Sequence, residues 1–378
     1  MLRTGAMKGQ IARAQTQDRG SRGFILALTL WIIALFGLGV AAINTWVSLA
    51  VDNARALKQR ADAEVALSNT TNEIIYAMGT RPMTRRGLEV GTDLKRPAQR
   101  DMLEAMTVNF ESEHYIAFDD RPYSMQSDAN YAVRIQDGRG LINLNIATPQ
   151  MLDRLLTIYG APETLRNQLP DTLADWTDED DLTRLAGAER DDYERRNRLP
   201  PSNVPLMTPL EAQNVLGWDE VPQLWEADQK SPLLTTCTVA GFNPNTAPET
   251  VLMTNLPGLT EPAAAQAIAR REENPFEHAR DFMDSANVTV PNEAFFFGVT
   301  PGNCVIVDFI DRTTGEDTRF SLSLNPFSTT QPWQVDYAYR IPSQYRRPAD
   351  KVDPKVAFPT PETIDPGLER NDGTAGSR

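Results

Sequence analysis

The stretch FILALTLWIIALFGLGVAAI, residues 24–43, contains no charged residue and decides how the chain begins. Twenty apolar residues in an α-helix span the roughly 30 Å hydrocarbon core of a bilayer. The uncharged sequence continues to residue 51, and residues 52–78 contain neither Pro nor Gly. We therefore predict one helix over residues 24–78. Its residues 24–51 form a transmembrane segment, and residues 52–82 continue it on the far side of the membrane.

Charge is distributed unevenly around this helix. Residues 1–23 carry a net charge of +4, whereas the whole chain carries −14, which leaves about −18 on the remainder. Because basic residues stay on the cytoplasmic side, the pattern predicts a single-pass inner-membrane protein with a cytoplasmic N-terminus and a periplasmic body. An acidic body repels phosphate backbones, so we expect no nucleic-acid partner. The apolar run is longer than the roughly 7–15 residues of a cleaved signal peptide, but a plain signal anchor fits it too.

The junction at Gly23 and Phe24 resembles the type IV prepilin leader, in which a glycine precedes a long apolar helix. The resemblance implies that a prepilin peptidase removes residues 1–23 and that Phe24 becomes a methylated N-terminus. Most members of that class carry a glutamate at the fifth mature position, where this chain has Leu28. In this departure the chain is similar to the minor pseudopilin K of type II secretion, the general secretion pathway protein K family.

That resemblance implies a structural role at the tip of the secretion pseudopilus, in support of protein export across the outer membrane. The implied partners are the minor pseudopilins I and J, the major pseudopilin, the prepilin peptidase and the inner-membrane secretion platform. A carboxylate within lipid is tolerated only when it is paired, so a subunit with Leu28 in its place needs no neighbour above it. The alternatives are a membrane-anchored periplasmic binding protein or enzyme, and a minor pilin of a type IV pilus.

The body is expected to be α+β, an antiparallel pseudopilin sheet interrupted by a large helical insertion. Alternating or apolar runs predict strands at residues 113–118, 131–136, 304–311 and 319–324. The turn residues DGRG after residue 136 indicate a hairpin into LINLN. The expected parts are the first half of the sheet domain at 83–145, the insertion at 146–298, the final strands at 299–326 and a Pro-rich, flexible tail at 327–378.

An internal repeat lies within the insertion. NLNIATPQML begins at Asn143 and NPNTAPETVL begins at Asn243, an offset of 100 residues. Asn and Thr hydrogen-bond the backbone before a helix, and Pro suits its first turn. The second copy continues into a sequence that resembles a helix–hairpin–helix unit of sterile-alpha-motif-like bundles, with its hairpin at residues 256–259. DNA-binding hairpins usually carry two glycines, and this one has only Gly258, so a structural role is favoured.

An acidic segment, DTLADWTDEDDLTRLAGAERDDYERR, covers residues 171–196. Closely spaced carboxylates on an irregular loop suit Ca²⁺, which takes six to eight oxygen ligands, and the family resemblance also implies calcium here. The spacing is not that of an EF-hand, and a solvated charged face is the alternative. The candidate calcium ligands are Asp178, Asp180, Asp181, Glu189, Asp191 and Asp192.

Catalytic motifs are not found in the sequence: it has no Gly-x-Ser-x-Gly, P-loop or His-Glu-x-x-His pattern, and nothing fixes a pair of acids at a glycosidase separation. We therefore expect no enzyme. The two cysteines, Cys237 and Cys304, lie in the exported part, where either a disulfide or two buried thiols are possible. In the tail, Trp333, Tyr337 and Tyr339 suit docking on the body or on a partner.

Overall fold

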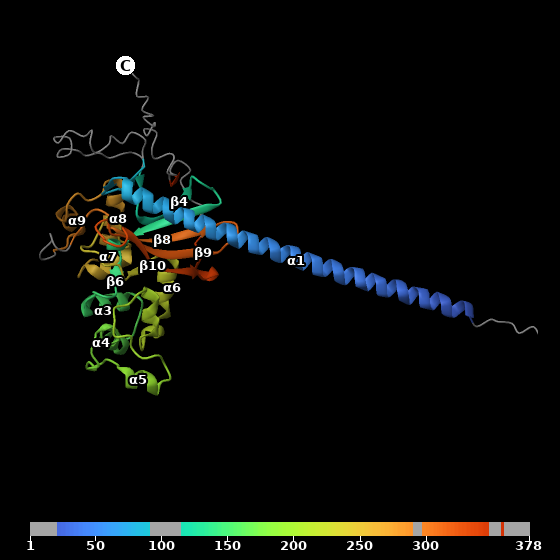
Figure 1. The fold of residues 1–378 in the computed structure, drawn as a ribbon. Helices are drawn as coiled ribbons and strands as arrows, with labels where there is room; N and C mark the ends of the chain where they lie inside the picture. The colour runs from blue at the N-terminus through green and yellow to red at the C-terminus, as the bar shows by residue number, and fades with distance from the viewer. Residues whose placement is uncertain (1–20, 91–114, 290–296, 348–356, 359–378) are drawn as a thin grey trace, which may run out of the picture. The chain divides into compact units, whose positions relative to one another are not determined.

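The computed structural model describes residues 21–90, 115–289, 297–347 and 357–358 (Figure 1). Most of the predicted leader, at residues 1–20, therefore lies outside the described residues. The chain divides into two compact units, residues 1–62 and residues 63–378, and each is described by itself.

Helix α1 covers Ser21–Thr80 and confirms the long helix predicted at residues 24–78. The helix is long and apolar enough to cross a membrane, and its apolar residues in the first unit are exposed. In the second unit, the last turns of α1 bury Ile74 and Ala77 against the core of a β-sheet. The helix is thus apolar all round near its start and one-sided near its end.

A six-stranded sheet forms the centre of the second unit, in the order β10-β9-β8-β5-β4-β11. All neighbours are antiparallel except β11, which runs parallel to β4. Every residue of β5 and β8 is buried, as expected for central strands covered on both faces. The strands are β4 (Asp119–Met125), β5 (Tyr131–Asp137), β8 (Cys304–Asp311), β9 (Asp317–Leu324), β10 (Trp333–Ile341) and β11 (Ala357–Phe358).

The two faces of this sheet differ in chemistry. One face carries an apolar cluster that includes Val307 and Phe309 and packs on the end of α1. The other face carries the buried ion pair between Arg319 Nε and Asp308 Oδ1, 2.6 Å apart. Arg319 also donates to the backbone carbonyls of Asp228 and Gln229, so it joins the sheet to the insertion. A buried pair is tolerated when its remaining donors are satisfied in this way.

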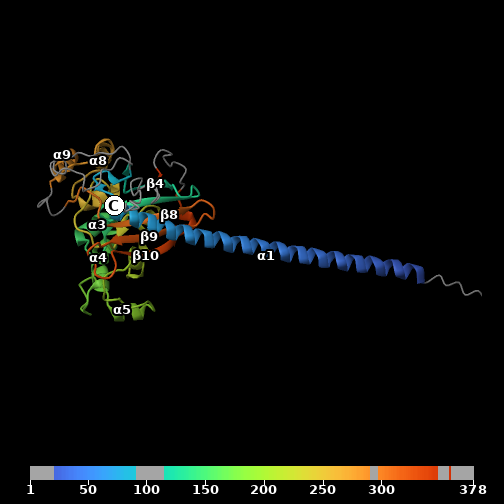
Figure 2. The same ribbon diagram turned by 45° about the horizontal axis from the view of Figure 1, so that its top comes forward.

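The helical insertion occupies residues 138–303, because Asp137 and Val305 are the last paired residues of the neighbouring strands β5 and β8. It therefore starts eight residues before the predicted boundary at 146. Its helices α3, α4 and α5 follow one another away from the sheet (Figures 1 and 2). The helices are α3 (Pro149–Ile158), α4 (Glu163–Thr177), α5 (Arg190–Arg195), α6 (Pro222–Lys230), α7 (Glu249–Asn255), α8 (Glu261–Glu273) and α9 (Ala279–Ala286). Shorter 3₁₀ turns are η2 (Gly138–Gly140), η3 (Pro209–Asn214) and η4 (Trp218–Glu220).

The expected hairpin through DGRG is wrong. Asp137 Oδ1 accepts a hydrogen bond from Arg139 N at 3.1 Å, which caps the 3₁₀ turn η2 instead. The following strand β6 (Ile142–Asn143) leaves the main sheet and pairs in parallel with β7 (Leu234–Thr235). The Asp137 side chain thus caps a 3₁₀ turn at the end of β5, and the chain continues into the insertion instead of forming a hairpin.

The expected flexible tail at 327–378 also needs correction. Trp333–Ile341 forms β10, an edge strand paired with β9 over its whole length apart from one bulge. After the 3₁₀ turn η5 (Ser343–Tyr345), Arg346 pairs with Asp317 at 3.0 Å and Arg347 pairs with Asp120. Residues 348–356 and 359–378 lie outside the described residues. Three further short strands, β1 (Met83–Thr84), β2 (Gly87–Glu89) and β3 (Tyr115–Ile116), form a separate sheet that includes part of the predicted strand at 113–118.

Candidate functional site

The internal repeat predicted from sequence forms the same turn twice. Asn143 Oδ1 accepts a hydrogen bond from Asn145 N at 2.9 Å, and Asn243 Oδ1 accepts from Asn245 N at 3.0 Å. Each turn leads directly into a helix, α3 in the first copy and α7 in the second. Asparagine side chains favour such local turns because they mimic the backbone.

The second asparagine of each copy holds a distant segment in place. Asn145 Oδ1 accepts from Leu206 N at 2.9 Å, and its Nδ2 donates to Leu206 O at 3.1 Å. Asn245 makes the same pair of bonds with Phe276, at 2.8 and 3.0 Å. One amide thus satisfies both backbone groups of a residue on another segment in both copies.

Both copies are helix–hairpin–helix units, which extends the expectation made for the second copy alone. Gly160 between α3 and α4 has φ +72°, and Gly258 between α7 and α8 has φ +83°. Helix α3 packs on α7, and Arg154 Nε donates to Thr254 O at 2.7 Å across this contact. These two residues are 100 positions apart, so equivalent parts of the repeat face each other.

The second copy is attached to the sheet through Asp137, which is fully buried. Its Oδ2 accepts from Asn243 Nδ2 and Thr246 Oγ1, both at 2.8 Å. Its Oδ1 accepts from Arg139 N and from Gly302 N, at 3.1 and 2.9 Å. Burial raises the pKa of this carboxyl group, and the four donors oppose that shift by stabilising the carboxylate.

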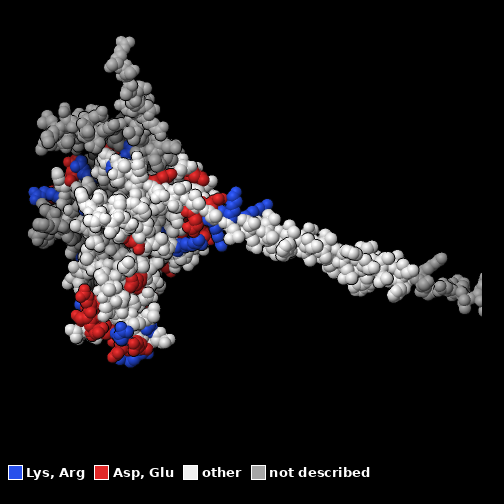
Figure 3. Space-filling view, in the orientation of Figure 1, with Lys and Arg blue, Asp and Glu red and all other residues white. Residues whose placement is uncertain are grey.

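The acidic segment lies at the end of the insertion formed by α4 and α5, where charged side chains gather (Figure 3). Glu189 is 6% exposed, and neither of its carboxylate oxygens has a hydrogen-bond partner among the described residues. Asp178 Oδ1 is likewise buried without a partner there. Such orphaned oxygens are costly unless a cation or water satisfies them, so they mark the centre of the candidate site.

Other acids surround this centre. Asp175 was not expected as a ligand, yet its side chain is fully buried at the base of the loop. Arg184 Nη1 lies 2.6 Å from Asp175 Oδ1 and also contacts Asp178. Asp180 Oδ1 accepts from Leu182 N at 2.8 Å, and Asp181 Oδ1 accepts from Asn203 Nδ2 at 3.2 Å. The burial of Asp175 depends on how α4 packs, which the spacing of acids does not reveal.

Asp191 and Asp192 are placed differently from the other predicted ligands. Asp192 Oδ2 accepts from Glu189 N at 3.3 Å, and its other oxygen contacts Arg195, so it caps α5. Asp191 is exposed in the first turn of α5. Acids in the first turn of a helix are favoured by the helix dipole, which accounts for both residues without a metal.

The pKa of Glu189 reflects its burial among these acids. Burial, and then the nearby charges of Asp175, Asp178, Asp181 and Asp180, raise the pKa of Glu189 to about 7. Among the residues that the structure describes, no three acids, histidines or cysteines already stand in metal-binding geometry. Arg184 supplies the positive charge between Asp175 and Asp178 in this arrangement. Carboxylate oxygens are the type of ligand that a hard cation takes.

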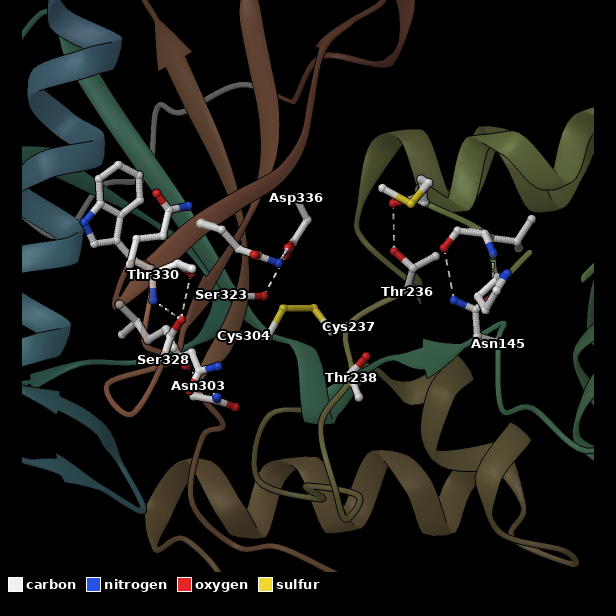
Figure 4. Close-up of a pocket in the computed structure, with 18 of the residues that line it drawn as sticks. Asn145, Thr236, Cys237, Thr238, Asn303, Cys304, Ser323, Ser328, Thr330 and Asp336 are labelled. Atoms are coloured by element: carbon white, nitrogen blue, oxygen red, sulfur yellow. Dashed lines mark hydrogen bonds between the residues drawn. A yellow bond between two sulfur atoms is a disulfide. The ribbon is translucent and has the colours of Figure 1, made fainter. Parts of the chain in front are cut away.

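The two cysteines form a disulfide that joins Cys237 of the insertion to Cys304 at the start of β8 (Figure 4). At the other end of the chain, the junction Gly23–Phe24 lies within α1, and the side chain of Leu28 is 48% exposed. Cleavage, methylation and the consequence of Leu28 stay predictions.

Two regions of the chain match models of a known protein family. Residues 134–223 and residues 242–294 each match a family model described as type II secretion system (T2SS), protein K. No curated protein matches. Among solved structures, the chain is similar to one in the GspK-GspI-GspJ complex of the enterotoxigenic Escherichia coli type 2 secretion system. That match has 16% identity and a TM-score of 0.41, and covers 56% of this chain and 79% of the other.

The first matched region contains the end of β5, the first repeat and the acidic loop, and the second contains the second repeat up to α9. Together they span the strand end at Asp137 and both helix–hairpin–helix units. In these two regions the chain is similar to the type II secretion system protein K family.

Proposed function

We propose that the chain is the minor pseudopilin at the tip of the secretion pseudopilus, where it supports protein export across the outer membrane as a structural subunit and not as an enzyme. The observation that carries this proposal is the place of the insertion on the sheet. The insertion emerges only at the Asp137–Val305 end of strands β5 and β8.

Contacts within residues 63–378 relate that end to the direction of α1. Near the Tyr131 end of the sheet, Glu64 of α1 lies 3.7 Å from Arg340 of β10. Just after α1 ends, Arg85 lies 3.2 Å from Glu277, which belongs to the insertion. The insertion therefore lies at the end of the sheet toward which α1 runs. A subunit stacked beyond this end would meet helices in place of a pseudopilin sheet.

Leu28 adds a second, independent reason. A glutamate within the apolar part of such a helix requires a positive partner, which a neighbouring N-terminus would supply. Leu28 is uncharged and requires no positive partner. A subunit at the tip of the fibre has no neighbour above it whose N-terminus such a glutamate would bind. The same reasoning would apply to a minor pilin at the tip of a type IV pilus. The choice of the type II secretion system over a type IV pilus therefore rests on the family match.

The proposed partners are the minor pseudopilins I and J, because the similar solved chain was crystallised with GspI and GspJ. On α1 beyond Asp52, Leu57 and Val65 are 66% and 60% exposed. Exposed aliphatic residues on a helix suit packing against other helices. The major pseudopilin and the inner-membrane platform are the further partners of an assembled fibre.

Processing at Gly23 is part of the same proposal. A prepilin peptidase would remove residues 1–23, methylation would follow at Phe24, and α1 would anchor the body in the periplasm from the inner membrane. N-terminal sequencing of the membrane-extracted protein should begin at Phe24, and Gly23→Ala should block both cutting and secretion. A mature protein that begins at Met1 or near Ala42 would instead support a plain anchored periplasmic protein.

The acidic loop is proposed to bind Ca²⁺. Asp178 and Glu189 would hold it through their buried, unpartnered oxygens, with Asp175, Asp180 and Asp181 as neighbouring acids. Bound calcium would neutralise the clustered charge and so stabilise the end of the insertion.

Thermal unfolding in detergent with calcium or chelator tests this site. At 100 times its dissociation constant, calcium should add about 2.7 kcal/mol to the free energy of unfolding. Asp178→Asn and Glu189→Gln should remove the gain, whereas Asp191→Asn, a matched exposed acid, should keep it. Identical melting curves with and without calcium would leave only a solvated acidic face.

Immunogold labelling of overproduced fibres tests the tip position. Antibody against this chain should mark one end of each fibre, while antibody against the major subunit should mark the whole shaft. Label spread evenly along the shaft would contradict the proposal even if processing at Gly23 were established.

A further inference from the structure

A groove of about 810 Å³ crosses one end of the six-stranded sheet (Figure 4). Its first wall is a row of paired residues on three adjacent strands, Cys304 of β8, Ser323 of β9 and Gln334 of β10. Its second wall belongs to the insertion, at residues 204–207 and 236–238. The volume lies in the range of ligand sites of roughly 300–1,000 Å³.

Both walls are fixed before any ligand arrives. The Cys237–Cys304 disulfide joins them covalently across the floor. Asn145 holds Leu206 through two hydrogen bonds, and Thr236 Oγ1 donates to Met207 O at 3.2 Å. A site whose width is set in advance loses little free energy in ordering itself around a ligand.

The lining is almost free of charge, although charged residues make up 23% of the chain. Asp336 is the one ionisable residue of this lining in the part of the chain that the structure describes, and it already accepts hydrogen bonds from Ser321, Ser323 and Gln334. Among the described residues, no lysine or arginine lines the groove, so a phosphate or carboxylate ligand would find no cationic partner in this lining. Further hydroxyl and amide side chains in the lining are Thr238, Asn303, Asn325, Ser328, Thr330 and Gln331.

We propose that this groove binds a neutral oligosaccharide. Hydroxyl and amide groups both donate and accept, as sugar hydroxyls require. An extended peptide would instead pair with the backbone of an edge strand. The groove runs across three strands and presents their side chains, whereas strand addition would use the free backbone edge of β10.

Titration calorimetry on the full chain, in a detergent without a sugar headgroup, tests the proposal. The probes are the tetramer of N-acetylglucosamine, maltotetraose and a neutral Ser/Asn/Gly octapeptide. At least one saccharide should bind and the peptide should not. Gln331→Ala should weaken binding about threefold through a lost hydrogen bond.

Gln331 is exposed, and Gln331→Ala therefore tests the groove without disturbing the core. Gln150→Ala, at an exposed glutamine of α3 outside the groove, should leave saccharide binding unchanged. The proposal fails if no saccharide binds at millimolar concentration, if the octapeptide binds instead, or if Gln331→Ala and Gln150→Ala behave alike.

Discussion

The two helix–hairpin–helix units share a turn and differ in what the turn touches. In the second copy, Thr246 is 4% exposed and binds Asp137 of the sheet. The residue 100 positions earlier is Ile146, which is 70% exposed and makes no such attachment. The asparagine turn therefore gives both copies the same local fold. The fourth residue of the turn, Thr246 or Ile146, determines whether the copy is attached to the sheet.

The consequences of this difference run through each copy. The second copy is joined to β5 and to the loop before β8 through one carboxylate. The first copy leads through α4 into the acidic loop, where buried carboxylate oxygens have no partner among the described residues. One unit of the repeat thus serves attachment, and the other carries the candidate cation site.

The largest expected effect comes from cutting the attachment. Asp137→Ala leaves four donors buried without an acceptor, so we expect a loss of about 3–5 kcal/mol in the free energy of unfolding. Denaturant unfolding of the detergent-solubilised chain measures it. Asp191→Asn is the control and should change stability by less than about 0.5 kcal/mol. A loss below about 1 kcal/mol for Asp137→Ala would mean that the second copy does not depend on this attachment.

The equivalent asparagines give a more direct comparison. Asn245 is 8% exposed and Asn145 is only half-buried, so truncation of Asn245 leaves the more deeply buried backbone groups unsatisfied. We expect Asn245→Ala to cost about 2–4 kcal/mol and Asn145→Ala about 1–2 kcal/mol. The same unfolding measurement ranks them. Equal losses would show that burial does not distinguish the two copies.

Calcium binding to the first copy should depend on pH. With the pKa of Glu189 raised to about 7, the folded, calcium-free chain keeps this proton where an unfolded chain has lost it. This group therefore stabilises the calcium-free fold at low pH, and the contribution is lost as the pH rises from about 4.5 to about 7. Calcium must displace the proton, so its affinity should fall about tenfold, or 1.4 kcal/mol, for each unit below pH 7. Titration calorimetry between pH 6 and pH 8 checks this, and a calcium affinity that stays constant over this range would contradict it.

The smallest effects are expected where the copies agree. Gly160 and Gly258 both have left-handed backbone, and no atom lies within 4 Å of an added Cβ at either. Alanine at either position should cost about 1 kcal/mol from backbone strain alone. Thermal unfolding should show equal shifts for the two variants. A clearly larger shift for one glycine would reveal a contact that the repeat does not share.

Local signals made much of this fold predictable. An uninterrupted apolar run specifies α1, a continuous buried run specifies β8, and the asparagine–proline pattern specifies both repeats. By contrast, β4 contains Pro122 and several charges, and it becomes a strand because β5 supplies its partner. Proline is tolerated there because the other neighbour of β4, strand β11, pairs only at Ser124 and Met125.

The candidate sites were less predictable because they, like β4, depend on contacts between segments that are distant in the sequence. Asp178 and Glu189 were expected as cation ligands from composition, but their orphaned oxygens depend on packing around α4. Asp191 and Asp192 have the same chemistry, yet helix α5 uses them at its N-terminus. The polar groove could not be predicted at all, because its walls come from segments far apart in the sequence.

The place of the insertion also has a consequence for the order in which the chain acquires its structure. Strand β5 precedes the insertion and its partner β8 follows it, so the central pairing of the sheet has to close a loop of residues 138–303. Closing so long a loop while it is unstructured is slow. If the helices of the insertion form first, the hydrogen bonds between Asp137 and the second asparagine turn bring β5 close to β8, and the ends of the loop are already near each other. We therefore expect the hairpin of β4 and β5 to form before β8 is available, so that one edge of β5 is unpaired during synthesis. The charged residue Arg134 on that hairpin limits wrong pairing until β8 arrives.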